Sequence, residues 1–273
     1  LLNSVMDLRK DNIEWRTVKL FGQEINLLTT AIAKMNMLLH GIEEFNIIRG
    51  DTIKDPKFVD KDKLKEFDVI FANPPYSIKK WDRSSFSMDP YGRNIYGVPP
   101  QGCADYAFFQ HILKSMEPKK GRAAMLWPHG ILFRDQEKKI REGVINSDVI
   151  EAVIGIGPNL FYNSPIESCI VVLRNEKQVS RKNKILFING VHEVTRKNAS
   201  SFLSEENINN LINAYYDPDD NSNIARIVDI DEIKINNFNL SIPLYVSSIN
   251  KRFIEEEKSL EEIINDLKSN RDS

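Results

Sequence analysis

At 273 residues the chain can bury a sizeable core, as one large domain or as one domain with an extension. Its 37 basic and 39 acidic residues are interspersed and leave a formal charge of −2, which excludes a basic arm or a cationic face across a whole domain. No apolar run is long enough to span a membrane. Two distant cysteines and four scattered histidines lack metal-ligand spacing, so we expect a cytoplasmic protein with reduced thiols and no metal site.

The first third of the chain predicts strands that alternate with a helix. Residues 1–6 resemble a helix, and Asn26 precedes an apolar helical pattern that Gly41 ends. Strands are expected at 17–25, 45–49 and 67–72, with a helix at 27–40 and a charged linker at 54–66. Strands and a helix of these lengths favour a parallel, doubly wound sheet.

The middle of the chain predicts an antiparallel addition to that sheet. Residues 77–103 read as an irregular loop, and a loop of this length beside a candidate site is usually a lid or a binding loop. Helices are expected at 104–116 and 135–146, and strands at 121–127, 149–154 and 166–173. The last two strands are too close for a helical crossover, so a hairpin joins them. A mostly parallel sheet with its last strand antiparallel is typical of Rossmann-like S-adenosylmethionine-dependent methyltransferases.

After Arg174 the composition shifts toward Asn, Lys, Glu, Asp and Ile. Strands at 184–188 and 224–228 and helices at 204–215 and 250–268 are expected there. We therefore predict a catalytic domain at 1–175 and a small, α-rich C-terminal extension at 176–273. The extension packs on the sheet or presents its last helix to a partner.

The segment Asn73-Pro74-Pro75-Tyr76 ends the apolar run 69–72, which we interpret as a buried strand. Two prolines cannot continue a ladder, and they fix φ, so the chain leaves the sheet in one stiff conformation. The Asn73 side-chain oxygen and the Pro74 carbonyl can accept hydrogen bonds from both N–H groups of an aromatic amine, and Tyr76 can stack on its ring. A strand followed by a proline-rich turn, with Asn73 as a cap, is the structural alternative.

Two acids fall at the ends of the preceding strands. Glu24 ends the strand at 17–25, and Asp51 follows the strand at 45–49. In an open parallel sheet, ligands bind outside the carboxyl ends of the strands. Glu24 could accept hydrogen bonds from ribose hydroxyls and Asp51 from an adenine amino group. Each acid alone is more often a turn or capping residue, but their order together with Asn73 favours a nucleoside site.

Several further segments extend these motifs. They include Trp127-Pro128-His129-Gly130 and Gly50-Asp51-Thr52, and the segments 21–26, 33–41, 104–108, 127–134, 159–162, 170–173 and 239–246. Over most of residues 17–246 the chain resembles the modification (methylation) subunit of type I restriction-modification systems, which are N6-adenine DNA methyltransferases.

The resemblance implies roles for the candidate residues. Glu24 would bind the ribose and Asp51 the adenine of S-adenosylmethionine, and the segment Asn73 to Tyr76 would hold the target adenine. Phe161 is a candidate second aromatic wall for the base, with core packing as the alternative. The implied partners are DNA, a specificity subunit and a restriction subunit. Asp105, at a helix start, is interpreted as an N-cap, and His129 as a structural residue, because amine methylation needs no histidine base.

The front of the chain departs from the family pattern, since neither the N-terminal helical domain nor a glycine-rich, Asp-initiated cofactor loop on a first strand is found. We expect a sheet without its first strand, and a 273-residue chain that binds S-adenosylmethionine poorly and is inactive alone. Methylation of an RNA adenine or a protein glutamine is the alternative activity. A scaffold that only docks a specificity subunit is the alternative from a different class.

Overall fold

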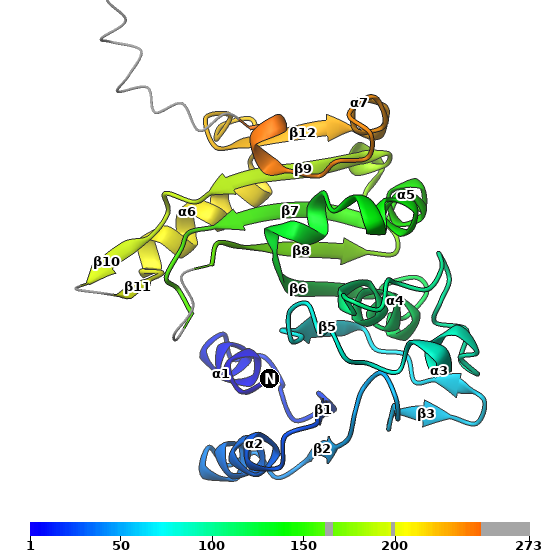
Figure 1. The fold of residues 1–273 in the computed structure, drawn as a ribbon. Coiled ribbons are helices and arrows are strands. Elements are labelled where there is room, and N and C mark those ends of the chain that lie inside the picture. The colour runs from blue at the N-terminus through cyan, green and yellow to red at the C-terminus, as the bar shows by residue number, and fades with distance from the viewer. Residues whose placement is uncertain (162–165, 198–199, 247–273) are drawn as a thin grey trace, which may run out of the picture.

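A six-stranded mixed sheet forms the centre of the protein in the computed structural model, which describes residues 1–161, 166–197 and 200–246 (Figure 1). The strand order is β12-β9-β7-β8-β6-β5. The strands are β5 (Val69–Ala72), β6 (Arg122–Pro128), β7 (Ile150–Ile156), β8 (Ser168–Arg174), β9 (Lys184–Gly190) and β12 (Ala225–Asp229). The pairings make β5, β6, β7 and β9 run in one direction and β8 and β12 in the other.

The predicted antiparallel strand is confirmed as β8, which forms a hairpin with β7. It is not the last strand of the sheet, because β8 lies between β6 and β7, and β9 and β12 extend the sheet beyond β7. Residues on both sides of the predicted boundary at 175 thus share one sheet. The division into two domains stays a prediction, and the helix predicted at 250–268 lies outside the described residues.

The N-terminal residues form a separate parallel pair of strands, β1 (Leu20–Glu24) and β2 (Phe45–Arg49). Helix α2 (Leu27–Leu39) connects them, and α1 (Leu2–Lys10) packs with them through Val5. The Asn26 side chain caps α2 by accepting a hydrogen bond from the Thr29 amide. Gly41 follows with φ of +69°, a left-handed conformation that glycine adopts without strain. The predicted cap, helix and stop are therefore confirmed.

An aromatic cluster attaches this strand pair to the start of β5. The Phe21 ring lies 5.3 Å from Phe58 and 5.4 Å from Phe67, measured between centroids. Phe58 precedes a short hairpin of β3 (Val59–Asp60) and β4 (Lys63–Leu64), where the sequence predicted only a linker. Within the described ranges, β1 pairs only with β2 and β5 pairs only with β6, so each has one open edge.

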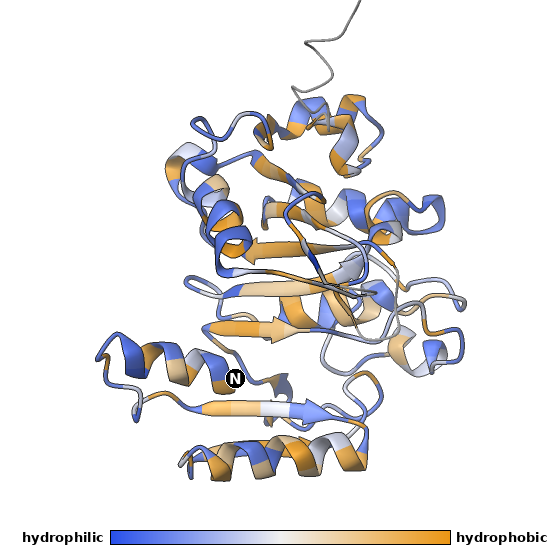
Figure 2. Cartoon of the chain, turned by 90° about the vertical axis from the view of Figure 1, so that its left-hand side faces the viewer, coloured by the Kyte–Doolittle hydropathy of each residue, from blue (hydrophilic) through white to orange (hydrophobic). Residues whose placement is uncertain are grey.

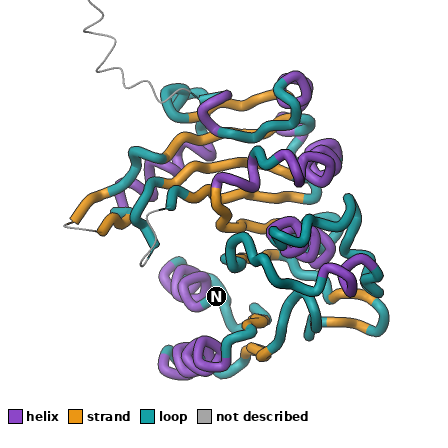
Figure 3. The backbone as a smooth tube through the Cα atoms, in the orientation of Figure 1, coloured by secondary structure: helices purple, strands orange, loops and turns teal. Residues whose placement is uncertain are grey.

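Helices cover both faces of the central sheet (Figure 3). On one face α4 (Asp105–Ser115), α5 (Lys138–Asn146) and α7 (Ile230–Ile235) bury the main core, in which Trp127 and Phe109 stack. On the other face α6 (Glu205–Tyr216) packs Leu211 and Ala214 against β7, β9 and β12. The smaller elements are α3 (Arg83–Ser87), β10 (Thr195–Lys197), β11 (Ser200–Phe202), and 3-10 turns at His129–Leu132, Asp135–Glu137, Val179–Arg181 and Ile242–Leu244.

The prediction that 69–72 is a buried strand is wrong for one face. Ile70 and Ala72 pack against the main core, but Val69 is 44% exposed and Phe71 is 62% exposed. Phe71 is in register with Ala124 of β6, which is in register through β8 with Ala152 of β7. Phe71 therefore points to the same face of the sheet as the residues that α6 covers. Helix α6 packs over β9 at the far side of the sheet, and the Val69 and Phe71 side chains of β5 are exposed on this face.

Helix α2 also exposes apolar side chains, and Figure 2 shows its hydrophobic residues at the lower edge of the molecule. The exposed side chains are Leu27, Leu28, Ile32, Met35, Leu38 and Leu39. None of the helices in the described part of the chain has the length and apolar character needed to cross a bilayer.

Candidate functional site

The predicted acids lie together at the carboxyl ends of β1 and β2. Glu24 is the last residue of β1 and is in register with Arg49, the last residue of β2. The Gly50 amide continues the pairing by donating to the Glu24 carbonyl at 3.0 Å. Asp51 therefore begins the turn beside Glu24, as expected for ends of neighbouring parallel strands.

Both acids have one oxygen committed to the local backbone. Glu24 Oε1 accepts from the Asn26 amide at 2.7 Å, and Asp51 Oδ1 accepts from the amides of Ile53 and Lys54 at 2.9 and 3.0 Å. The second oxygen of each carboxylate has no hydrogen-bond partner among the residues that the structure describes. The local turn thus orients each side chain and leaves an acceptor for a ligand.

Two side chains pack closely around Gly50 at this turn. A Cβ at Gly50 would lie 2.9 Å from Gln23 Nε2 and 3.1 Å from the Lys57 side chain. Gln23 itself spans the turn, since Nε2 donates to the Asp55 carbonyl and Oε1 accepts from the Lys57 amide, both at 2.9 Å. The glycine therefore leaves room at this turn for the Gln23 and Lys57 side chains.

The segment Asn73-Pro74-Pro75-Tyr76 follows the end of β5, as predicted. Asn73 is exposed, and its side chain makes no hydrogen bond to any described residue, while Pro74 is buried and Tyr76 is half-buried. Burial raises the pKa of the Tyr76 phenol, an effect that the neighbouring Ser168 hydroxyl partly offsets. The amide of Asn73 is thus presented to solvent from a stiff and anchored turn.

Asp105 anchors that turn, and its interpretation as an N-cap is wrong. Ala104 holds the N-cap position of α4, and the fully buried Asp105 carboxylate accepts from the Ser77 amide at 2.7 Å. Ser77 has φ of +50°, a left-handed conformation that costs a non-glycine residue about 1 kcal/mol or more. Asp105 and its partners therefore hold the residue after Tyr76 in a strained conformation.

Arg134 completes this anchor. Its guanidinium pairs with Asp105, donates to Ser77 Oγ at 3.2 Å and donates to Glu137 Oε2 at 2.6 Å. Burial raises the pKa of Glu137, although Arg134 opposes the shift. Sequence reasoning missed Arg134, and the only signal for it was its place in the segment 127–134.

Two further residues have different outcomes. His129 Nε2 lies 3.0 Å from the Ser168 carbonyl, so the ring holds the start of β8, in line with a structural role. Phe161 is half-buried in the loop between β7 and β8. Its role as an aromatic wall stays a prediction.

Cys103 and Cys169 are both buried free thiols, and burial raises the pKa of each to about 12.

The fold is α/β, and these side chains form a candidate ligand site at the carboxyl edge of its parallel strands. A family model described as N-6 DNA Methylase matches residues 1–253, and the chain belongs to this family.

Proteins similar to the chain are methylase subunits of type I restriction enzymes. The MjaVII methylase subunit from Methanocaldococcus jannaschii is 36% identical over 90% of this chain and 44% of its own length. The HindI methylase subunit from Haemophilus influenzae is 31% identical over 85% of the chain and 52% of its own length. The chain thus spans about half the length of these curated relatives.

A solved structure is similar in fold and in sequence. It is a type I restriction-modification methyltransferase subunit from Streptococcus thermophilus, with a TM-score of 0.80 and 30% identity. The match covers 89% of this chain and 52% of the other. A modification subunit of a putative type I restriction enzyme from Vibrio vulnificus matches with a TM-score of 0.65 at 18% identity, a likeness of fold alone.

Proposed function

We propose that residues 1–273 form the catalytic part of the methylase subunit of a type I restriction-modification system, and that this subunit methylates N6 of adenine in DNA. The observation that carries the proposal is the exposed Asn73, held at the carboxyl end of β5 by a turn that Asp105 and Arg134 anchor. Membership of the N-6 DNA methylase family supports it.

The chemistry requires acceptors, since the adenine amine is a poor nucleophile whose lone pair is delocalised into the ring. The Asn73 side-chain oxygen and the Pro74 carbonyl accept from its two N–H groups. These bonds favour a tetrahedral nitrogen and localise the lone pair on it. Preorganised acceptors of this kind contribute without a strong base.

Tyr76 stacks on the target base. The base must first leave the duplex, because its amine cannot be reached inside the helix. The half-buried ring of Tyr76 precedes the anchored Ser77 turn, and this supports a preordered face for the stacking. Phe161 supplies the opposite wall in this proposal.

S-adenosylmethionine is the proposed cofactor, and it supplies an electrophilic methyl group when bound. The donor set fits a nucleoside: Glu24 and Asp51 each keep one carboxylate oxygen without a partner in the described structure. Glu24 accepts from the ribose hydroxyls, and Asp51 accepts from the adenine amino group. Asn73, which directly follows β5, also faces the cofactor in this proposal.

The near-neutral charge of the chain supports a subunit that depends on a partner for much of its contact with the DNA phosphates. Phosphate contacts dominate DNA affinity, and no domain-wide basic face occurs in this sequence. A specificity subunit therefore selects the sequence, and a restriction subunit joins the same complex.

The 273 residues alone do not bind the cofactor well in this proposal. Among the described residues β5 pairs only with β6 and has an open edge, as expected if a further strand of the parent protein completes the sheet there. Calorimetry with S-adenosylmethionine tests this point. Micromolar affinity for the isolated chain would overturn it without affecting the proposed activity of the parent protein.

The activity is tested by modification-sensitive long-read sequencing of the source genome, with the parent gene intact and deleted. Deletion is expected to remove N6-methyladenine from one split recognition motif. Unchanged adenine methylation, with the intact parent expressed, would overturn DNA methylation. It would favour an RNA or protein substrate, or a scaffold that docks a specificity subunit.

A further inference from the structure

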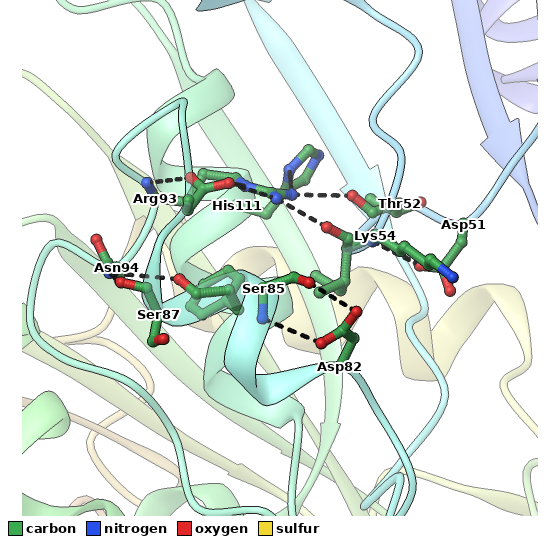
Figure 4. A network of polar contacts seen from close by, with 12 residues as sticks. Asp51, Thr52, Lys54, Asp82, Ser85, Ser87, Arg93, Asn94 and His111 are labelled. Atoms are coloured by element: carbon green, nitrogen blue, oxygen red, sulfur yellow. Dashed lines mark hydrogen bonds and ion pairs between the residues drawn. The ribbon is translucent and has the colours of Figure 1, made fainter.

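We propose that Arg93 is a positioning residue for the cofactor: it fixes the two peptide groups that follow Asp51 and thereby orients the Asp51 carboxylate. This inference rests on the proposed function, in which Asp51 accepts from the cofactor adenine. Arg93 lies in the loop 77–103, and it does not itself touch the Asp51 side chain. Figure 4 shows the network that joins them.

Arg93 is buried with its guanidinium fully bonded. Only 3% of its side chain is exposed, and the side chain of its counter-ion Asp89 is 1% exposed. Nε and Nη2 both donate to Asp89 Oδ1, at 3.0 and 2.7 Å. The remaining donors reach across the molecule, because Nη1 donates to the Thr52 carbonyl at 3.0 Å and Nη2 to the Ile53 carbonyl at 2.7 Å.

The same two peptide groups bind Asp51 from their other side. The peptide between Thr52 and Ile53 gives its carbonyl to Arg93 and its N–H to Asp51 Oδ1. The peptide between Ile53 and Lys54 does the same. Two peptide dipoles thus lie between a buried cation and a carboxylate, each with its negative end toward Arg93 and its positive end toward Asp51. Chains of this kind polarise one another, so the guanidinium strengthens both bonds to Asp51.

Hydrogen bonds and apolar contacts with α4 hold the loop that carries Arg93, so the loop is a fixed support for the Asp51 turn and not a moving lid. Gln110 of α4 accepts from the Tyr96 amide at 2.8 Å and donates to the Gly97 carbonyl at 2.9 Å. Ile53, from the Asp51 turn, packs with Phe86 of the loop and Ala107 of α4. Helix α4 therefore supports both halves of the site, since its first residue, Asp105, anchors the turn after Tyr76.

His111 of α4 completes the contact with Arg93. Its Nδ1 lies 3.3 Å from Arg93 Nη1, and burial together with the adjacent guanidinium lowers the pKa of His111 to about 3. The ring is neutral and accepts the bond. A lysine at position 93 could keep the charge beside Asp89 but could not reach all these acceptors, because only the guanidinium presents donors in a planar fork.

The test compares Arg93→Met and Arg93→Lys with wild type in the intact parent protein. Lys177→Met is the matched control, because Lys177 is also a buried cation, bound to Asp148 Oδ1 at 2.6 Å and to the Lys184 carbonyl at 2.8 Å. It follows the end of β8, at the edge of the sheet opposite the site. The readouts are the KM for S-adenosylmethionine, kcat at saturating cofactor, and amide exchange at Ile53 and Lys54.

For Arg93→Met we expect KM for S-adenosylmethionine to rise about tenfold or more and exchange at Ile53 and Lys54 to accelerate about tenfold, because charged hydrogen bonds are lost. We expect kcat at saturation to change far less, and Arg93→Lys to be intermediate. Lys177→Met lowers the melting temperature without changing KM. If Arg93→Met fails to fold, the comparison rests on Arg93→Lys.

Unchanged KM and unchanged exchange in the folded Arg93 variant would overturn the positioning role while leaving the proposed function intact. A KM shift that Lys177→Met reproduces would also overturn it, since general destabilisation would then explain the effect. A wild-type parent that neither binds S-adenosylmethionine nor methylates DNA would overturn the proposed function, and this inference with it.

Discussion

Asp105→Ala provides a direct test of the anchor beneath the Asn73-Pro74-Pro75-Tyr76 turn. The substitution leaves the Ser77 amide without its acceptor, which costs about 1–3 kcal/mol for a buried donor. It also removes the carboxylate that pairs with Arg134. Breaking a fully buried pair costs about 3–5 kcal/mol. Arg134 keeps Glu137 as a partner and is 28% exposed, so we expect a smaller cost here.

The combined expectation is a loss of about 3 kcal/mol in the free energy of unfolding, because the two terms share one side chain and do not add. For a chain of this size that corresponds to a melting temperature lower by about 6–12 °C. Without the bond from its amide to Asp105, Ser77 is expected to relax from its φ of +50° and to displace Tyr76. A displacement of about 1 Å at reacting groups can cost about 100-fold in rate, and we expect a loss of that order in methyl transfer.

Glu151→Ala is the matched control. Glu151 is also a buried carboxylate paired with a partly exposed arginine, with side-chain exposures of 9% and 27% for Glu151 and Arg174. It accepts from the Tyr215 hydroxyl at 2.7 Å and lies far from the carboxyl edge. Chemical denaturation and a methyl-transfer assay in the parent protein, below both melting temperatures, should show similar destabilisation but preserved activity for Glu151→Ala. Equal activity in the two variants would refute the positioning role of Asp105.

Three further predictions concern other parts of the chain. Burial lowers the pKa of His111 to about 3 in the folded protein, against about 6.5 in the unfolded chain, so protonation of His111 favours unfolding. The contribution of His111 to the free energy of unfolding is therefore fully present above pH 6.5, and about 2 kcal/mol of it is lost at pH 5. Urea unfolding of His111→Asn should lack this component, and an identical pH profile would contradict it. Phe71→Lys should reduce self-association of the 273-residue chain in light scattering, since it charges an exposed apolar edge strand; unchanged association would count against that edge. Asn26→Ala should destabilise the protein by about 1 kcal/mol through loss of the α2 cap, whereas Asn26→Asp should retain it.

Local patterns predicted the elements whose causes lie within a few residues. Helix α2 carries its cap at Asn26 and its stop at Gly41, and β2 was predicted with its observed bounds. The order of Glu24, Asp51 and Asn73 at three strand ends also followed from the sequence. Each of these features is determined by residues that lie close together in the sequence.

Features that depend on distant residues were missed. Asp105 was interpreted as a cap because its acceptor role depends on Ser77, 28 residues away. Arg93 and the Thr52 carbonyl are 41 residues apart, and no local pattern marks either one. The exposure of Phe71 was missed for the same reason, since an apolar strand pattern does not say whether a helix covers both faces of the sheet.

The central claim is that Asn73 acts on the target adenine, and Asn73→Ala in the intact parent protein tests it most directly. The variant should be expressed from the chromosome in place of wild type, with N6-methyladenine mapped by sequencing and subunit assembly followed by co-purification. Because Asn73 is exposed and its side chain bonds to no described residue, its loss should leave folding and assembly unchanged. We predict that methylation of the recognition motif disappears while the complex still forms. Methylation at the wild-type level in the assembled variant would contradict the account.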